Sequence, residues 1–130
     1  MTKPETVCPR FHYAVELIGR RWTGAIVRML MGEPRRFAEL ALSVPDLSDR
    51  MLAERLRELE QEGIVARTVT PEIPVRVEYS LTPMGRALDA SIRALGEWAE
   101  EWLPGDAGES KATEAKLGAV TKAPLSTARR

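Results

Sequence analysis

The segment 36–62 constrains the fold most, because it carries two amphipathic helical patterns with only a short break between them. In the first pattern, apolar residues recur at positions i, i+3, i+4 and i+7, which form one face of a helix. These residues are Phe37, Leu40, Ala41 and Val44. Pro45 and Asp46 then interrupt the pattern, so we expect one short helix that ends close to Val44.

The second pattern predicts a helix that begins at Ser48 and ends at Gly63. Serine is a favoured N-cap residue, and Asp49 in the first turn is stabilised by the positive end of the helix dipole. Glycine commonly ends a helix because it readily adopts the left-handed conformation. The apolar face of this helix consists of Leu52, Leu56 and Leu59.

Two short amphipathic helices joined by so brief a turn must cross steeply to bury both apolar faces against a third element. This is the helix-turn-helix arrangement, whose second helix can lie in the major groove of DNA. The face opposite the leucines is polar and consists of Arg50, Ala53, Glu54 and Arg57. An ordinary solvated face of a helical hairpin has the same composition, so these residues alone leave both interpretations open.

The residues after Gly63 predict an antiparallel pair of strands at 64–69 and 75–81. The second strand alternates apolar with polar residues, which is typical of a half-buried strand. The connection 70–74 is too long for a tight hairpin and should project as a loop. A helix-turn-helix followed directly by a projecting hairpin is a winged helix, and this context favours the DNA interpretation.

Further helices are expected on both sides of this unit. Cys8-Pro9 opens a helix that Gly19 ends, because proline suits the first helical position, and another helix spans 22–31. Thr82-Pro83 begins a long last helix that ends at Pro104. Its apolar stripe either folds back over the core or packs on a partner subunit, and we favour the partner subunit.

Length and composition predict one domain. A chain of 130 residues with 44% hydrophobic content can form a genuine core, which we place at 8–103 after a mobile arm at 1–7. The segment 104–130 lacks aromatic residues and periodicity, so we expect a disordered, weakly basic tail. The net charge is +0, so bulk charge attracts neither DNA nor an anionic membrane.

The sequence offers few residues for catalysis or metal binding. A single Cys and a single His exclude an intrachain disulfide and the usual metal clusters. There is no Gly-rich phosphate loop and no recognisable carboxylate pair, so we expect neither an enzyme nor a cofactor. No apolar run approaches the length of a membrane span, and no signal peptide is recognisable, which predicts a soluble cytoplasmic protein.

A series of ordered landmarks spans about residues 8–103: Cys8-Pro9, IGRRW at 18–22, RRFAEL at 35–40, Leu47-Ser48 with Met51-Leu52, RLRELE at 55–60, Gly63, Arg67, Pro74, RVEYSLT at 76–82, Gly85, Leu95 and Trp98. Through these landmarks the chain resembles the HxlR-type bacterial transcription regulators, winged-helix proteins related in architecture to the MarR group. Many landmarks at matching spacings are more specific than any single motif.

The resemblance implies an α+β, mainly α, winged helix-turn-helix with extra N- and C-terminal dimerisation helices. It implies a homodimer whose paired recognition helices enter successive major grooves of a near-palindromic operator, and it names no small-molecule effector. We assign DNA binding to Arg36, Ser48, Asp49, Arg50, Ala53, Glu54, Arg57 and Arg76. We assign the dimer interface to Phe11, Val15, Ile18, Leu88, Ile92, Leu95, Trp98 and Trp102.

Some members of the family respond to oxidants or electrophiles through a cysteine at the position of Cys8, which makes Cys8 a redox-sensing candidate. As the N-cap of the first helix, Cys8 would lie beside unpaired N–H groups and the positive end of the helix dipole, which stabilise a thiolate. The alternative is a small, partly buried and inert residue.

The sequence departs from the family pattern at Arg20 and Asp46, which replace usual glycines, and at Ala53, which replaces a usual hydroxyl residue. The competing interpretation is a winged-helix protein-interaction module without specific DNA binding. It is supported by the neutral net charge and by the acidic residues Glu54, Glu58, Glu60 and Glu62 on the second helix.

Overall fold

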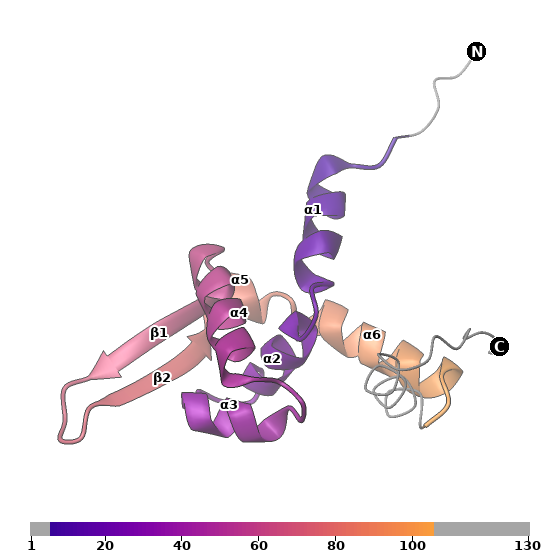
Figure 1. The fold of residues 1–130 in the computed structure, drawn as a ribbon. Helices are drawn as coiled ribbons and strands as arrows, with labels where there is room; N and C mark the ends of the chain where they lie inside the picture. The colour runs from indigo at the N-terminus through magenta and orange to yellow at the C-terminus, as the bar shows by residue number, and fades with distance from the viewer. Residues whose placement is uncertain (1–5, 106–130) are drawn as a thin grey trace, which may run out of the picture. The chain divides into compact units, whose positions relative to one another are not determined.

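The computed structural model describes residues 6–105 (Figure 1). The elements in chain order are α1 (Pro9–Ile18), α2 (Thr23–Leu30), α3 (Phe37–Ser43), α4 (Asp49–Gln61), β1 (Val65–Thr70), β2 (Arg76–Leu81), α5 (Pro83–Arg86) and α6 (Asp89–Trp102). The chain divides into two compact units, Met1–Ile92 and Arg93–Arg130. The predicted arm and tail fall mostly outside the described residues, so the domain boundaries remain predictions.

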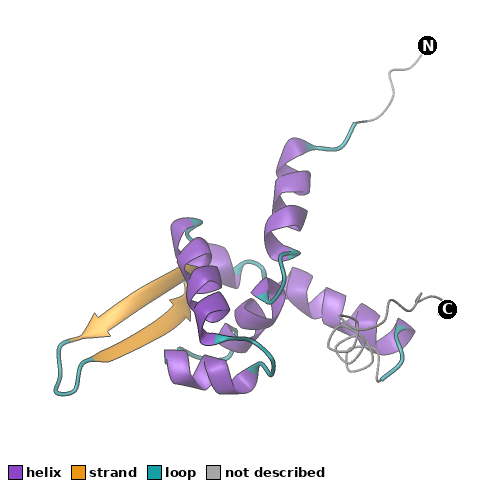
Figure 2. Ribbon diagram, viewed as in Figure 1, coloured by secondary structure: helices purple, strands orange, loops and turns teal. Residues whose placement is uncertain are grey.

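Aliphatic side chains from the helices and the base of the sheet form the core of the first unit, and helices predominate in the chain (Figure 2). Both α2 and α4 bury one face completely, and in α4 this is the predicted leucine face: the buried residues are Ile26, Val27, Leu30, Leu52, Leu56 and Leu59. Burial of each such side chain is worth about 1.5–3 kcal/mol. These contacts hold α4 by its leucine face and leave the opposite face free.

The helix-turn-helix has the predicted form. The backbone of Asp46 in the turn is left-handed, with φ 69°, and Ser48 is the N-cap of α4. The Ser48 hydroxyl accepts a hydrogen bond from the backbone N–H of Met51 at 3.1 Å. Gly63 follows α4 with φ 84°, the conformation that glycine adopts without steric cost.

The two strands pair antiparallel, with Val65 opposite Leu81 and Thr70 opposite Arg76. The strand β2 is half-buried as predicted: residues 76–80 are all half-buried and Leu81 is buried, although exposure does not alternate along the strand. Only the base of the wing joins the core, and the hairpin extends away from it (Figure 1). Its connecting loop projects as predicted, with Ile73 fully exposed.

A short pairing on the edge of β2 was not expected from the sequence. Arg35 forms an isolated antiparallel bridge with Tyr79. The N–H of Arg35 donates to the carbonyl of Tyr79 at 2.9 Å, and the N–H of Tyr79 donates to the carbonyl of Arg35 at 2.8 Å. This bridge attaches the connection between α2 and α3 to the wing.

The single long C-terminal helix predicted from Thr82 is wrong, because the chain forms two helices, α5 and α6. Thr82 caps α5 as expected, accepting a hydrogen bond from the N–H of Gly85 at 3.1 Å. Gly85 packs against the backbone of Ile64, and glycine propagates a helix poorly. α5 ends at Arg86 after one turn, the N–H of Leu88 donates to the carbonyl of Gly85 at 3.0 Å, and α6 begins at Asp89.

The first helix has the predicted bounds, with Cys8 as its N-cap and Gly19 as its C-cap. Only Leu17 of α1 is buried, while Phe11 and Val15 of the predicted apolar stripe are exposed. No helix in the described part of the chain has the length and apolar character needed to span a bilayer.

Candidate nucleic-acid interface

The exposed face of α4 carries most of the predicted DNA-binding residues. Arg50, Ala53 and Arg57 are exposed and Glu54 is half-buried, opposite the buried leucines. Ala53 lies between the two arginines in sequence, and its small side chain projects little from the helix. Arginine donates in bidentate fashion to guanine in the major groove, so this face has the chemistry of direct base readout.

Ser48 and Asp49 are exposed at the N-terminal end of α4. The hydroxyl oxygen of Ser48 already accepts the hydrogen bond from Met51. Its remaining lone pair and its O–H can still reach an outside group, and the N-terminus of a helix favours anions such as phosphate.

The two flanking arginines differ in their surroundings. Arg36 is the N-cap of α3, and its backbone N–H donates to Glu39 Oε1 at 2.9 Å, which leaves its exposed side chain free to reach outward. Arg76 on β2 is half-buried, and its Nε lies 3.3 Å from Glu78 Oε2. A DNA phosphate would have to compete with Glu78 for Arg76.

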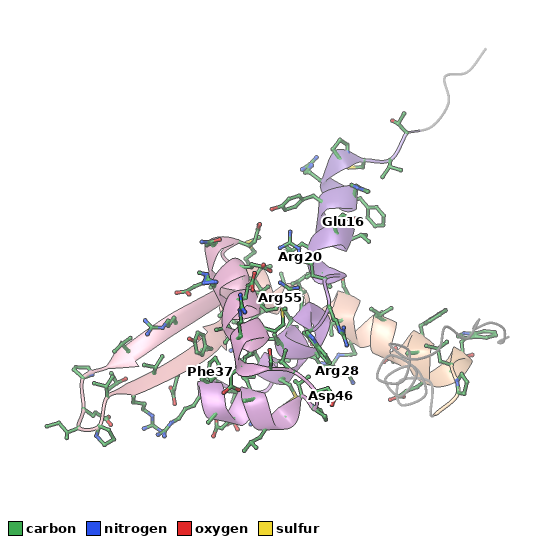
Figure 3. The ribbon with its side chains drawn as sticks, viewed as in Figure 1. Glu16, Arg20, Arg28, Phe37, Asp46 and Arg55 are labelled. Carbon is green, nitrogen blue, oxygen red and sulfur yellow. The ribbon has the colours of Figure 1, made fainter. Side chains whose placement is uncertain are left out.

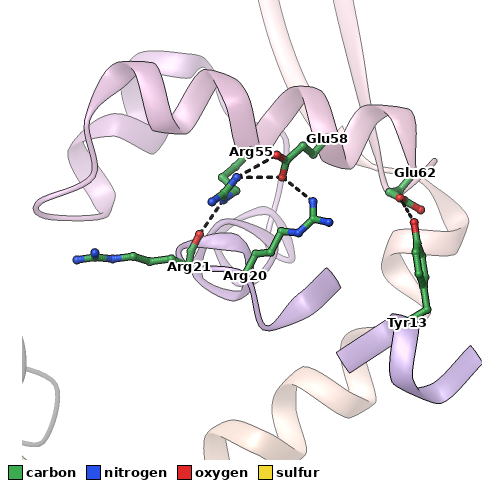
Figure 4. Close-up of polar contacts among 6 residues, drawn as sticks. All are labelled: Tyr13, Arg20, Arg21, Arg55, Glu58 and Glu62. Carbon is green, nitrogen blue, oxygen red and sulfur yellow. Dashed lines mark hydrogen bonds and ion pairs between the residues drawn. The ribbon is translucent and has the colours of Figure 1, made fainter. Parts of the chain in front are cut away.

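Two acidic residues of α4, Glu58 and Glu62, form polar contacts with residues of the N-terminal segment (Figure 4). Arg55 donates to both carboxylate oxygens of Glu58, at 3.1 and 3.0 Å, and Arg20 donates to Glu58 at 3.1 Å. The Nε of Arg55 donates to the backbone carbonyl of Arg21 at 2.9 Å. Glu58 is therefore neutralised by two arginines and does not oppose the approach of DNA.

Glu62, the C-cap of α4, accepts a hydrogen bond from the hydroxyl of Tyr13 on α1 (Figure 4). This hydrogen bond and the negative charge of Glu62 raise the pKa of Tyr13 above its ordinary value. Neither the Tyr13 contact nor the Arg55 contacts were foreseen. The i,i+3 spacing of Arg55 and Glu58 was a usable signal, whereas nothing local pairs Tyr13 with Glu62.

The arginines at 20–36 serve different structural purposes. Arg20 lies beside Arg55, where α4 meets the turn before α2, while Arg28 is exposed on α2 (Figure 3). The guanidinium of Arg21 lies 4.9 Å from the ring centroid of Trp22, a cation–π distance. Trp22 takes the left-handed backbone conformation here, with φ 75°. Arg20 is not left-handed, although it replaces a usual glycine of the family.

Cys8 is a free, exposed thiol at the N-cap of α1. Its side chain makes no capping hydrogen bond, so the thiol remains accessible. Of the residues assigned to the dimer interface, Phe11, Val15, Leu95, Trp98 and Trp102 are exposed and Ile18 and Leu88 are half-buried. Ile92 is buried in the hydrophobic core of the chain itself. Within residues 6–105, no cluster of His, Cys, Asp or Glu could hold a metal ion.

A sequence model described as HxlR-like helix-turn-helix matches residues 17–107, which include the helix-turn-helix, the wing and α6. The chain belongs to the HxlR-like helix-turn-helix family. It is accordingly a DNA-binding transcriptional regulator of the HxlR type with a winged helix-turn-helix fold.

Among relatives of this HxlR-type chain are two HTH-type transcriptional regulators of Bacillus subtilis strain 168. YvaP is 48% identical over 97 residues, which cover 75% of this chain and 90% of YvaP. YodB is 48% identical over 102 residues, which cover 78% of this chain and 91% of YodB. Both relatives are named as transcriptional regulators and not as enzymes.

Solved structures of YodB and of the redox regulator HypR share the fold. The reduced form of YodB superposes with a TM-score of 0.69 at 46% identity, covering 75% of this chain and 96% of YodB. YodB has also been solved after diamide treatment and with bound quinone, each with a TM-score of 0.65. The redox regulator HypR in its oxidized form gives 0.68 at 38% identity, covering 72% of this chain and 96% of HypR.

Proposed function

We propose that this HxlR-type regulator binds DNA as a homodimer, with the α4 helices of two subunits in successive major grooves of a near-palindromic operator. The observation that carries the proposal is the exposed face of α4, where Arg50 and Arg57 flank Ala53. Glu58 is paired with Arg20 and Arg55 and so opposes DNA less than the sequence suggests. Successive major grooves on one side of the duplex are about 34–36 Å apart.

Exposed apolar side chains on α1 and α6 support self-association. Phe11 of α1 is 65% exposed, and Trp98 and Trp102 of α6 are 52% and 67% exposed. Large aromatic side chains gain substantial free energy when a partner covers them. A second subunit would cover them.

The test of the DNA interface is the replacement of Arg50 or Arg57 by Ala. Each substitution should cost roughly 1–3 kcal/mol of operator affinity, because each arginine would lose bidentate contacts to a base. Gln61→Ala, at the exposed C-terminal end of α4, is the control and should bind normally. Normal operator affinity of both arginine variants would show that this face does not read bases.

Arg36 and Arg76 should instead contact the DNA backbone. Their replacement by Ala should weaken binding to all sequences alike and reduce the salt slope of binding by about one each. The protein-interaction alternative predicts no steep salt dependence for the parent protein, whereas phosphate binding weakens steeply as salt is added.

We further propose that Cys8 responds to oxidants or electrophiles. Its thiol is exposed at the start of α1, and the relative YodB has been solved with diamide treatment and with quinone. The chain contains one cysteine, so the modified form would be a Cys8–Cys8 disulfide between subunits, a mixed disulfide with a small thiol, or a quinone adduct.

Diamide or a quinone should reduce operator binding by the parent protein and leave the cysteine-free variant Cys8→Ser unaffected. Mass spectrometry would establish modification of Cys8 in the same samples. Unchanged binding by protein that is fully modified at Cys8 would show that this thiol is not a switch.

A further inference from the structure

Two separate links join the recognition helix α4 to the N-terminal segment that carries Cys8 (Figure 4). The first is the hydrogen bond from the hydroxyl of Tyr13, midway along α1, to the carboxylate of Glu62 at the end of α4. The second is the cluster of Arg55, Glu58 and Arg20, which includes the hydrogen bond from Arg55 to the Arg21 carbonyl.

The two links differ in what they hold. The side chain of Arg55 is 15% exposed and that of Glu58 is 26% exposed, so this pair is sheltered from solvent. Arg55 of this pair contacts the backbone of Arg21 in the turn between α1 and α2. This turn leads directly into α2, whose apolar residues lie in the core. This second link therefore fixes α4 to the core but does not set the direction of α1.

The Tyr13–Glu62 contact is different because it is exposed and lies beyond the turn, on α1 itself. Leu17 is the only buried residue of α1, so few apolar contacts hold this helix at a fixed angle to the core. The turn also contains Trp22 in a left-handed conformation, which is a strained state for a bulky residue.

We infer that Tyr13 and Glu62 are positioning residues, which set the angle between α1 and the recognition helix α4. The inference rests on the proposed function, in which α1 forms part of the dimer interface. If α1 is held by the partner subunit, its angle to α4 determines how far apart the two recognition helices stand. The Tyr13–Glu62 bond then selects the half-site separation that the dimer accepts.

The test uses the full chain and a series of operator fragments in which the half-site separation changes by single base pairs, each about 3.4 Å. The parent protein should prefer one separation. Tyr13→Phe and Glu62→Ala each remove the bond, so each should lower the ratio of affinities for the best and the neighbouring separation by at least about fivefold, the lower end of measured couplings. The double variant should be no worse than either single variant.

Two controls separate positioning from a general structural effect. Glu60→Ala removes a carboxylate side chain from an exposed position of the same helix and should keep the parent preference. Affinity for an isolated half-site should be the same in parent and variants, because the face of α4 that touches DNA is unaltered.

Each outcome decides one question. A parent protein without any separation preference overturns the proposed dimeric binding, and this inference with it. A parent preference that both variants retain overturns the inference alone. Equal weakening on every fragment, including the half-site, also overturns it, because the contact would then merely support the fold of α4.

Discussion

The hydroxyl of Tyr13 donates a hydrogen bond to the carboxylate of Glu62, which favours the protonated phenol, and the negative charge of Glu62 also disfavours the phenolate. The pKa of Tyr13 is therefore raised in the folded protein. Since an unperturbed Tyr has a pKa of about 10, the stabilisation from this bond is fully present below that pH. It is lost as the pH rises through the raised pKa.

Replacing Glu62 with Gln should lower the pKa of Tyr13 toward its ordinary value, because the repelling charge is removed. The chain has two tyrosines, so a Tyr79→Phe background isolates the signal of Tyr13. The measurement is the ultraviolet absorbance of the phenolate as a function of pH. An unchanged titration in the Gln variant would show that the two side chains do not meet in solution.

At the level of single residues, interactions between neighbours in the sequence could be predicted, whereas interactions between distant residues could not. Ser48 as N-cap and Asp46 in a left-handed turn were predictable, because capping and turn geometry depend on neighbouring residues. The partner of Tyr13 was not predictable, because Glu62 is distant in sequence and reaches α1 only once the helices have packed. The assignment of individual DNA-binding and dimer residues remains a prediction.

At the scale of elements, the helix-turn-helix and the wing could be predicted from the spacing of apolar residues. This spacing indicates which side of each helix or strand must be buried. The break between α5 and α6 did not follow, since the apolar stripe of the last helix continues across it. Gly85 packs closely against Ile64 and Leu81 at the base of the sheet beside this break, a tertiary contact that a one-dimensional pattern does not contain.

Gly85→Ala should destabilise the protein by roughly 1–3 kcal/mol, the usual cost of overpacking a core. A Cβ at this position would overlap the carbonyl oxygen of Ile64 and lie 3.1 Å from side-chain atoms of both Ile64 and Leu81. Urea unfolding monitored by circular dichroism measures the change. Gly105→Ala is the control, because a Cβ there meets nothing within 4 Å, and equal stability of the two variants would contradict the close fit at Gly85.

At the scale of the whole molecule, the distribution of apolar surface predicts the oligomeric state. Replacing both Trp98 and Trp102 with Gln should yield monomers, because it removes large exposed aromatic surfaces from α6. Sedimentation velocity measures the change, and operator affinity should fall with it because one half-site alone binds weakly. Glu97→Gln, on the same helix, should remain dimeric. A parent protein that sediments as a monomer would contradict this assignment.

The wing has a consequence for the behaviour of the protein in concentrated solution. Within residues 6–105, β1 pairs only with β2, and the other edge of β2 is joined only at Tyr79, so backbone N–H and C=O groups along both edges can pair with another chain. Val69, Ile73 and Val75 add exposed apolar surface to the same hairpin. With a formal net charge of +0 and a sequence pI of about 6.6, long-range repulsion between molecules is weak near neutral pH. We therefore expect strand addition through the wing to favour self-association at high protein concentration, and buffers well above the pI to oppose it.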